Sequence, residues 1–123
     1  MIKISYGFNK DADFRIINQV QNPDFQQFTV YEKETKRSYK LRLRIPGKHN
    51  ALNAVASLIV CKRAGIKISI IKKSFDEFGG VSRRIENKGD RTIGKAKITL
   101  IDDYGHHPTE INETVAAVRS AFK

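Results

Sequence analysis

The chain has 123 residues, 40% of them hydrophobic, and this composition predicts a globular domain or parts of two domains. No apolar run is long enough to span a bilayer and the amino terminus lacks a signal-peptide pattern, so we expect a cytoplasmic protein with no membrane partner. The net charge of +10 raises the question of a polyanionic partner. Because lysine and arginine are spread along the chain and no known nucleic-acid motif occurs, we predict no nucleic-acid binding and attribute part of the charge to a phosphate-bearing small molecule.

Four strands are expected in the first 45 residues. They cover residues 6–8, 14–20, 28–32 and 39–45, with polar segments between them, and the last three predict an antiparallel meander. The fourth strand alternates most clearly, with Tyr39, Leu41, Leu43 and Ile45 on one face and Lys40, Arg42 and Arg44 on the other. We interpret the basic face as solvated rather than as a binding surface.

Two helices are predicted after Pro46-Gly47. The first begins near Asn50, which suits an N-cap, and ends at Gly65. Its expected buried face consists of Leu52, Val55, Ala56, Ile59 and Val60. The second helix runs from Ser69 to a stop at Gly79-Gly80. Its apolar face consists of Ile71, Phe75 and Phe78.

Packing does not explain His49 and Asn53, which lie four residues apart at the amino end of the first helix. Helix N–H groups and side-chain amides at such a position can meet a base or a phosphate. The alternative is structural, with an asparagine that caps the helix and a histidine that fills the turn. The pair Arg83-Arg84 has a similar ambiguity, because it is either a phosphate clamp or surface charge on a turn.

A change of composition near Gly79-Gly80 predicts a boundary, with one unit at residues 1–80 and a second at residues 81–123. After a polar turn around residues 87–90, residues 96–101 alternate like a strand. A helix is expected from Pro108 to about Phe122, with Glu110 in its first turn. Its packing stripe on a sheet is expected to consist of Ile111, Val115, Val118 and Phe122. One strand and one helix cannot bury an adequate core, so we expect the chain to be part of something longer.

Six polar or conformationally special residues connect this strand to this helix. They are Asp102, Asp103, Tyr104, Gly105, His106 and His107. Loops at the carboxyl ends of strands are where ligands bind in open α/β sheets, so we predict a site here. Two alternatives stay open. Either histidine could cap the helix, or Asp103, His106 and His107 could bind a metal, although adjacent histidines rarely point at one ion.

Three blocks in this order and spacing resemble the Mur ligase family. They are Gly47-Lys48-His49-Asn50 with Asn53, at residues 45–54; Gly79-Gly80 with Arg83-Arg84, at residues 78–86; and Asp102-Asp103-Tyr104-Gly105-His106-His107-Pro108, at residues 101–110. The last block is close to a signature of the alanine-adding branch, whereas the first is shared by the wider family. Tyr6-Gly7 followed by Ala12-Asp13 adds modest support.

The resemblance implies an ATP-dependent ligase of peptidoglycan precursor synthesis that joins L-alanine to UDP-N-acetylmuramate through an acyl phosphate. The residues implied to contact ATP are His49, Asn50 and Asn53 at the adenine, Arg84 at the phosphates and Asp103 at the ribose. Those implied at the reaction centre are Tyr104 and His106. The resemblance also implies Mg²⁺, but assigns no metal ligand to this chain.

Some features of the family differ or are missing. The residue after the paired arginines is Ile85, where the family usually has an aromatic residue. We find no GKT or GKS phosphate loop, no acid and histidine of the central domain that hold magnesium, and no amino-terminal domain for the UDP-sugar. We therefore expect this chain to be inactive alone and to need the remaining parts of the enzyme.

The expected fold class is α/β. An antiparallel three-stranded meander plus helices would form the end of the central ATP-binding domain, and the first strand–helix unit of a Rossmann-like carboxy-terminal domain would follow. Two alternatives are kept. A sister ligase that attaches a recycled murein peptide shares much of the pattern, and a free-standing basic module that binds RNA or another polyanion would explain the charge but not the three blocks.

Overall fold

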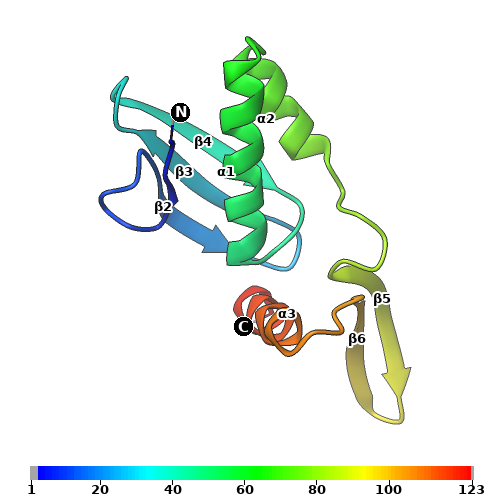
Figure 1. Cartoon of the computed structure of the whole chain (residues 1–123). Helices are drawn as coiled ribbons and strands as arrows, with labels where there is room; N and C mark the ends of the chain where they lie inside the picture. Colours follow the sequence, from blue (N-terminus) through cyan, green and yellow to red (C-terminus); the bar gives the residue numbers. More distant parts are fainter. Residues whose placement is uncertain (1–2, 123) are drawn as a thin grey trace.

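The computed structural model describes residues 3–122, and a four-stranded sheet forms its first part (Figure 1). The sheet has the order β1 (Tyr6–Gly7), β2 (Phe14–Gln21), β3 (Gln26–Glu32) and β4 (Arg37–Leu43). β1 pairs with β2 in parallel, and β2, β3 and β4 pair antiparallel. The predicted meander is therefore confirmed, and the expected short first strand lies at its edge.

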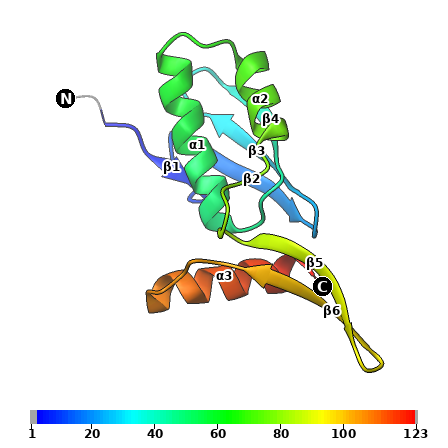
Figure 2. The ribbon, with the colours of Figure 1, turned by 90° about the vertical axis from the view of Figure 1, so that its right-hand side faces the viewer.

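Two helices cover one face of this sheet, α1 (Lys48–Arg63) and α2 (Ile68–Glu77) (Figure 2). The strands bury every second residue against them, as the alternation in the sequence predicts. The buried strand residues of this core are Phe14, Ile16, Phe28, Val30, Tyr39, Leu41 and Leu43. Val55 and Leu58 of α1 are fully buried on them, and each such side chain contributes about 1.5–3 kcal/mol of transfer free energy.

Two details of α1 correct the prediction from sequence. The N-cap is Gly47 and not Asn50, because α1 begins at Lys48 and Asn50 instead donates its side-chain amide to the Pro46 carbonyl at 2.7 Å. Val60 is 67% exposed, although it was expected in the buried face. The buried side is centred on Val55 and Leu58, and Val60 points away from it. Within residues 3–122 no helix is both long and apolar enough to cross a membrane.

The second part of the chain is a hairpin followed by a helix, and it lies beyond the amino end of α1 (Figures 1 and 2). β5 (Glu86–Ile93) and β6 (Ala96–Asp102) pair antiparallel, and α3 (Pro108–Ala121) follows. Where β5 lies, we expected only a polar turn. The expected turn at residues 87–90 is a bulge within the strand, because the register shifts between Asn87 and Asp90.

The buried side of α3 also differs from the expectation. Ile111 is 46% exposed and Val115 is 42% exposed, whereas the buried residues are Ala117 and Ala121. A Cβ built on Gly47 would lie 3.2 Å from the Cβ of Ala117, so small side chains allow α3 to approach the turn before α1 closely. α3 therefore packs mainly through its alanines here, and of the predicted stripe Val118 and Phe122 are half-buried while Ile111 and Val115 are exposed.

Candidate functional site

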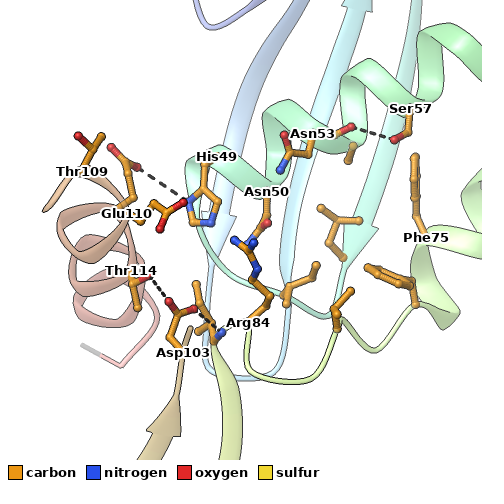
Figure 3. Close-up of a pocket in the computed structure, with 17 residues that line it drawn as sticks. His49, Asn50, Asn53, Ser57, Phe75, Arg84, Asp103, Thr109, Glu110 and Thr114 are labelled. Carbon is orange, nitrogen blue, oxygen red and sulfur yellow. Dashed lines mark hydrogen bonds and ion pairs between the residues drawn. The ribbon is translucent and has the colours of Figure 1, made fainter. Parts of the chain in front are cut away.

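A pocket of about 520 Å³ lies between α1, the segment that follows α2, and α3 (Figure 3). Its apolar wall consists of Leu43, Ile45, Ala54, Phe75, Phe78, Val81 and Ile85. Its polar wall consists of His49, Asn50, Asn53, Ser57, Arg84, Asp103, Thr109, Glu110, Glu113 and Thr114. All five residues that the sequence assigned to nucleotide binding are in this second group, although they come from three separate blocks of the chain.

Helix α1 presents His49, Asn50, Asn53 and Ser57 to the pocket, because residues three or four apart share one side of a helix. Asn50 is held by its hydrogen bond to the Pro46 carbonyl. The side-chain amide of Asn53 makes no hydrogen bond to any residue in the described part of the chain, and Ser57 bonds only the Asn53 carbonyl, at 3.0 Å. Asn53 is therefore free to hydrogen-bond a ligand.

His49 of α1 and Glu113 of α3 lie close to each other in the pocket wall. The distance from His49 Nδ1 to Glu113 Oε2 is 3.9 Å, and both side chains are partly exposed. His49 Nδ1 is itself buried and has no hydrogen-bond partner among residues 3–122. This loose pair connects α1 to α3, since each helix supplies one partner.

The two arginines of the predicted clamp diverge. Arg84 lines the pocket, whereas the guanidinium of Arg83 stacks over the Tyr104 ring at 4.8 Å from its centroid. The backbone on either side of Arg84 is left-handed, with φ of 61° at Arg83 and 48° at Ile85. Such angles are costly for non-glycine residues, above all for a β-branched one, so other contacts must hold them in place.

Asp103 supplies such a contact. Its Oδ2 accepts the backbone N–H of Ile85 at 2.8 Å, and its Oδ1 accepts the N–H of Gly105 at 2.8 Å and the hydroxyl of Thr114 at 3.2 Å. Burial alone would raise the pKa of Asp103, but these hydrogen bonds and the charge of Arg84 outweigh it and hold the pKa below its usual range. Asp103 is thus a charged carboxylate in the wall of the pocket.

Tyr104 and His106 lie outside the pocket. Neither is among the residues that line it, and the His106 side chain is 75% exposed. The two rings meet edge-on with centroids 5.4 Å apart, and His106 Nδ1 lies 3.3 Å from the Tyr104 carbonyl and 3.7 Å from Glu110 Oε2. The structure therefore keeps this pair together, and neither residue belongs to the pocket lining.

Residues 1–61 match the family model described as the Mur ligase middle domain. Over 122 residues the chain is 38% identical to a UDP-N-acetylmuramate–L-alanine ligase of Vesicomyosocius okutanii, covering 98% of this chain and 26% of that protein. The chain belongs to the Mur ligase family. It spans about a quarter of the length of this Mur ligase relative.

Solved Mur ligase structures share the fold. The chain superposes on UDP-N-acetylmuramate–alanine ligase MurC of Thermotoga maritima with a TM-score of 0.81 and 26% identity, over 98% of this chain and 27% of that one. MurF of Acinetobacter baumannii gives a TM-score of 0.76 at 23% identity, over 95% of this chain and 24% of that one, and shows the fold alone. The α/β fold class that the sequence predicted is thereby confirmed.

The next histidine in this Mur ligase chain, His107, has the structural role that was left open. It is the N-cap of α3, where its Nδ1 accepts the backbone N–H of Thr109 at 3.3 Å. Glu110 completes a capping box by accepting the N–H groups of His106 at 3.4 Å and His107 at 3.5 Å. These backbone hydrogen bonds lower the pKa of Glu110.

The geometry of the loop does not support the alternative of a metal bound by Asp103, His106 and His107. Asp103 points to Ile85 and Thr114, and His107 points into the helix, so the proposed ligands do not face one point. Among residues 3–122 no three His, Cys, Asp or Glu side chains are grouped so that they could hold an ion.

Several pocket residues were not singled out from the sequence. Phe75 and Phe78 were assigned to the packing face of α2, yet both line the pocket. Thr109, Glu113 and Thr114 were not assigned any role, although they share one side of α3. The spacing of the last three residues was a usable signal, because it puts a polar stripe on the helix that follows the predicted loop.

Proposed function

We propose that the pocket between α1 and α3 binds ATP, as part of a ligase that adds L-alanine to UDP-N-acetylmuramate in peptidoglycan precursor synthesis. The observation that carries the proposal is that the residues expected to contact ATP come together in one pocket. His49, Asn53, Arg84 and Asp103 come from distant parts of the sequence and line one pocket. The named relative, at 38% identity, supports the choice of reaction.

The two walls of the pocket suit the parts of a nucleotide. The wall containing Phe75, Phe78 and Ile85 offers the apolar surface that a purine ring requires, and the amide of Asn53 is free to hydrogen-bond its edge. Arg84 offers a guanidinium for phosphate oxygens. The charged Asp103 would accept a hydrogen bond from a ribose hydroxyl, in addition to the three that it already accepts.

The ligation that we propose has two steps. A carboxylate oxygen of the muramoyl substrate attacks the γ-phosphorus of ATP, and ADP leaves with the pair of electrons of the broken P–O bond. The amine of L-alanine then attacks the acyl phosphate carbon, phosphate leaves and a proton is lost from nitrogen. Tyr104 and His106 are proposed at this reaction centre, on the exposed side of the loop where their rings adjoin. The described residues offer no fitting magnesium site, so we assign the ion no step within this chain.

The arrangement also supports a proposal for domain organisation. We propose that residues 1–80 end the central ATP-binding domain and that residues 81–123 begin the carboxy-terminal ligase domain. The core of the first part is continuous from β2 to α2, and the irregular segment between α2 and β5 separates it from the hairpin. The family match and the relatives do not support the alternatives of a recycling ligase or a free-standing polyanion-binding module.

The test is an ATP titration of the 123-residue chain by calorimetry, with Asn53→Ala compared with Asn112→Ala. Both asparagines are exposed in the interior of a helix, but only Asn53 lines the pocket. The two substitutions therefore change helix propensity alike and differ in the lost ligand contact. We expect Asn53→Ala to weaken ATP binding by about 3- to 10-fold, and Asn112→Ala to leave the affinity unchanged.

GTP serves as the second ligand, because it has the same phosphates and ribose as ATP. An ATP site at this pocket requires that ATP bind more tightly than GTP and that Asn53→Ala reduce the difference. Equal affinity for both nucleotides, or equal effects of the two alanine variants, would contradict the proposal.

A further inference from the structure

Gln26 is a fully buried polar side chain on the apolar face of β3. It occupies the same inner face as Phe28 and Val30, where an unpaired amide would be costly. Its amide is well paired. Nε2 donates to the Ile45 carbonyl at 2.6 Å and to the Gly47 carbonyl at 3.0 Å, and Oε1 accepts from Gln19 Nε2 at 2.8 Å. Because only an NH₂ group can face two carbonyls, the orientation of this amide is fixed.

Gln21, the register partner of Gln26 on β2, holds the same turn through a second hydrogen bond. Its Oε1 accepts the backbone N–H of Gly47 at 2.6 Å. The two glutamines therefore bind both polar groups of Gly47, the N–H through Gln21 and the carbonyl through Gln26.

Gly47 needs such support. It is the N-cap of α1 with φ of 106°, and no side chain caps the helix there. Its carbonyl also accepts the first helical hydrogen bond, from the N–H of Ala51 at 3.2 Å. His49 and Asn50 follow directly, so the orientation of the Gly47 peptide sets how the first turn of α1 presents these side chains to the pocket.

We infer that Gln26, together with Gln21, is a positioning residue that fixes the Gly47 turn and thereby the amino end of α1 for ligand binding. The inference rests on the proposed function for its ligand, ATP. Gln26 lines no part of the pocket and acts only through Gly47. A buried amide costs desolvation that an apolar residue would not, and the hydrogen-bonded turn is what it provides in return.

The experiment uses the 123-residue chain and the variant Gln26→Met, which keeps the length of the side chain and removes its hydrogen bonds. Gln27→Met is the matched control, because Gln27 is the next residue of β3 and its side chain points to the opposite face. Val30→Ala is the stability control, since Val30 is fully buried on the same face of β3 but its register partners are Ile16 and Tyr39 and not Gln21.

Two readouts are measured under conditions where every variant is folded. The first is amide hydrogen exchange at Gly47 and Ala51, which reports on the turn without any ligand. The second is the dissociation constant for ATP. We expect Gln26→Met to speed exchange at these two amides by about 10-fold relative to Val30→Ala, and to weaken ATP binding by about 10-fold. Gln27→Met is expected to change neither.

Exchange at Gly47 and Ala51 equal to that of Val30→Ala would overturn the inference, and so would faster exchange with unchanged ATP affinity. If Gln26→Met does not fold, Gln21→Met takes its place. Gln21 is only half-buried, and this substitution removes the hydrogen bond to the Gly47 N–H. If the unmodified chain binds no ATP, the proposed function fails. The hydrogen exchange then still decides whether Gln26 holds the turn.

Discussion

The carboxylate of Asp103 accepts the backbone N–H of Ile85 at 2.8 Å, and this bond joins the loop before α3 to the segment that carries Arg84. Ile85 is buried with φ of 48°, a conformation that a β-branched residue rarely adopts. The hydrogen bond helps to hold it there. Asp103 therefore shapes the pocket wall at Arg84 as well as contributing a charge to it.

The variant Asp103→Asn is expected to change how stability depends on pH. The pKa of Asp103 is lowered in the folded chain, so its ionised form stabilises the fold fully above the unfolded value of about 3.9, and this contribution is lost as pH falls through the folded value. We expect the difference in the free energy of unfolding between the unmodified chain and Asp103→Asn to be constant from about pH 5 to pH 7 and to shrink below about pH 4. Urea unfolding at a series of pH values measures it. A difference that stays constant down to pH 2 would show that the folded carboxylate is not preferentially ionised.

Alanine substitutions of the two neighbouring histidines, His106 and His107, are expected to have different effects on stability and activity. His107→Ala removes the N-cap of α3 and should lower the free energy of unfolding by about 0.5–2 kcal/mol. His106→Ala removes an exposed ring and should leave stability nearly unchanged, while lowering kcat/KM for amide formation in an enzyme completed with the missing parts. Urea unfolding of both variants, with kinetics of the completed enzyme, separates the roles. Normal turnover of the His106→Ala enzyme would contradict the proposed role of His106 at the reaction centre.

The strands and several residues of the pocket lining could be predicted because the sequence carries a direct signal for each. Strands β2 to β4 bury one face and expose the other, so hydrophobic residues recur with period two. His49, Asn53 and Arg84 stood out because packing did not explain them, and each lines the pocket. What the sequence could not show was that they meet, since that depends on how α3 packs beside α1.

The misplaced elements lacked such a signal. β5 exposes most of both faces, so no alternation distinguishes it from a polar turn. The N-cap of α1 was assigned to Asn50 because asparagine is a good capping residue, but the positive φ of Gly47 and the distant glutamines Gln21 and Gln26 determine where the helix begins. The stacking of Arg83 on Tyr104 is likewise a contact that sequence spacing does not reveal.

The purified 123-residue chain is expected neither to hydrolyse ATP nor to form an amide. Catalysis of phosphoryl transfer depends mostly on positioning the phosphates and neutralising their charge, and the sequence contains no glycine-rich phosphate loop for this. The measurement is release of phosphate from ATP and transfer of labelled alanine to UDP-N-acetylmuramate. ATP-dependent ligation by this chain alone would contradict the prediction, whereas ATP binding without turnover would agree with it.

Gly47→Ala is expected to damage both the fold and the pocket, with Gly94→Ala as its control. Both glycines have positive φ, 106° at Gly47 and 62° at Gly94. A Cβ on Gly94 would meet open space, so Gly94→Ala should cost only the backbone strain of about 1 kcal/mol. A Cβ on Gly47 would lie 2.8 Å from His49 Cε1 and 3.2 Å from Ala117 Cβ, and its φ is further from any region that alanine adopts.

We therefore expect Gly47→Ala to lower the free energy of unfolding by about 2–5 kcal/mol, as the sum of strain and overpacking. Because the new methyl group would push His49 and α3 away from the turn, ATP affinity should fall as well. Urea unfolding and ATP titration of the two variants measure both effects. Equal losses of stability for Gly47→Ala and Gly94→Ala would mean that α3 does not pack against the turn as closely as the structure shows, and that the pocket between α1 and α3 is wider in solution.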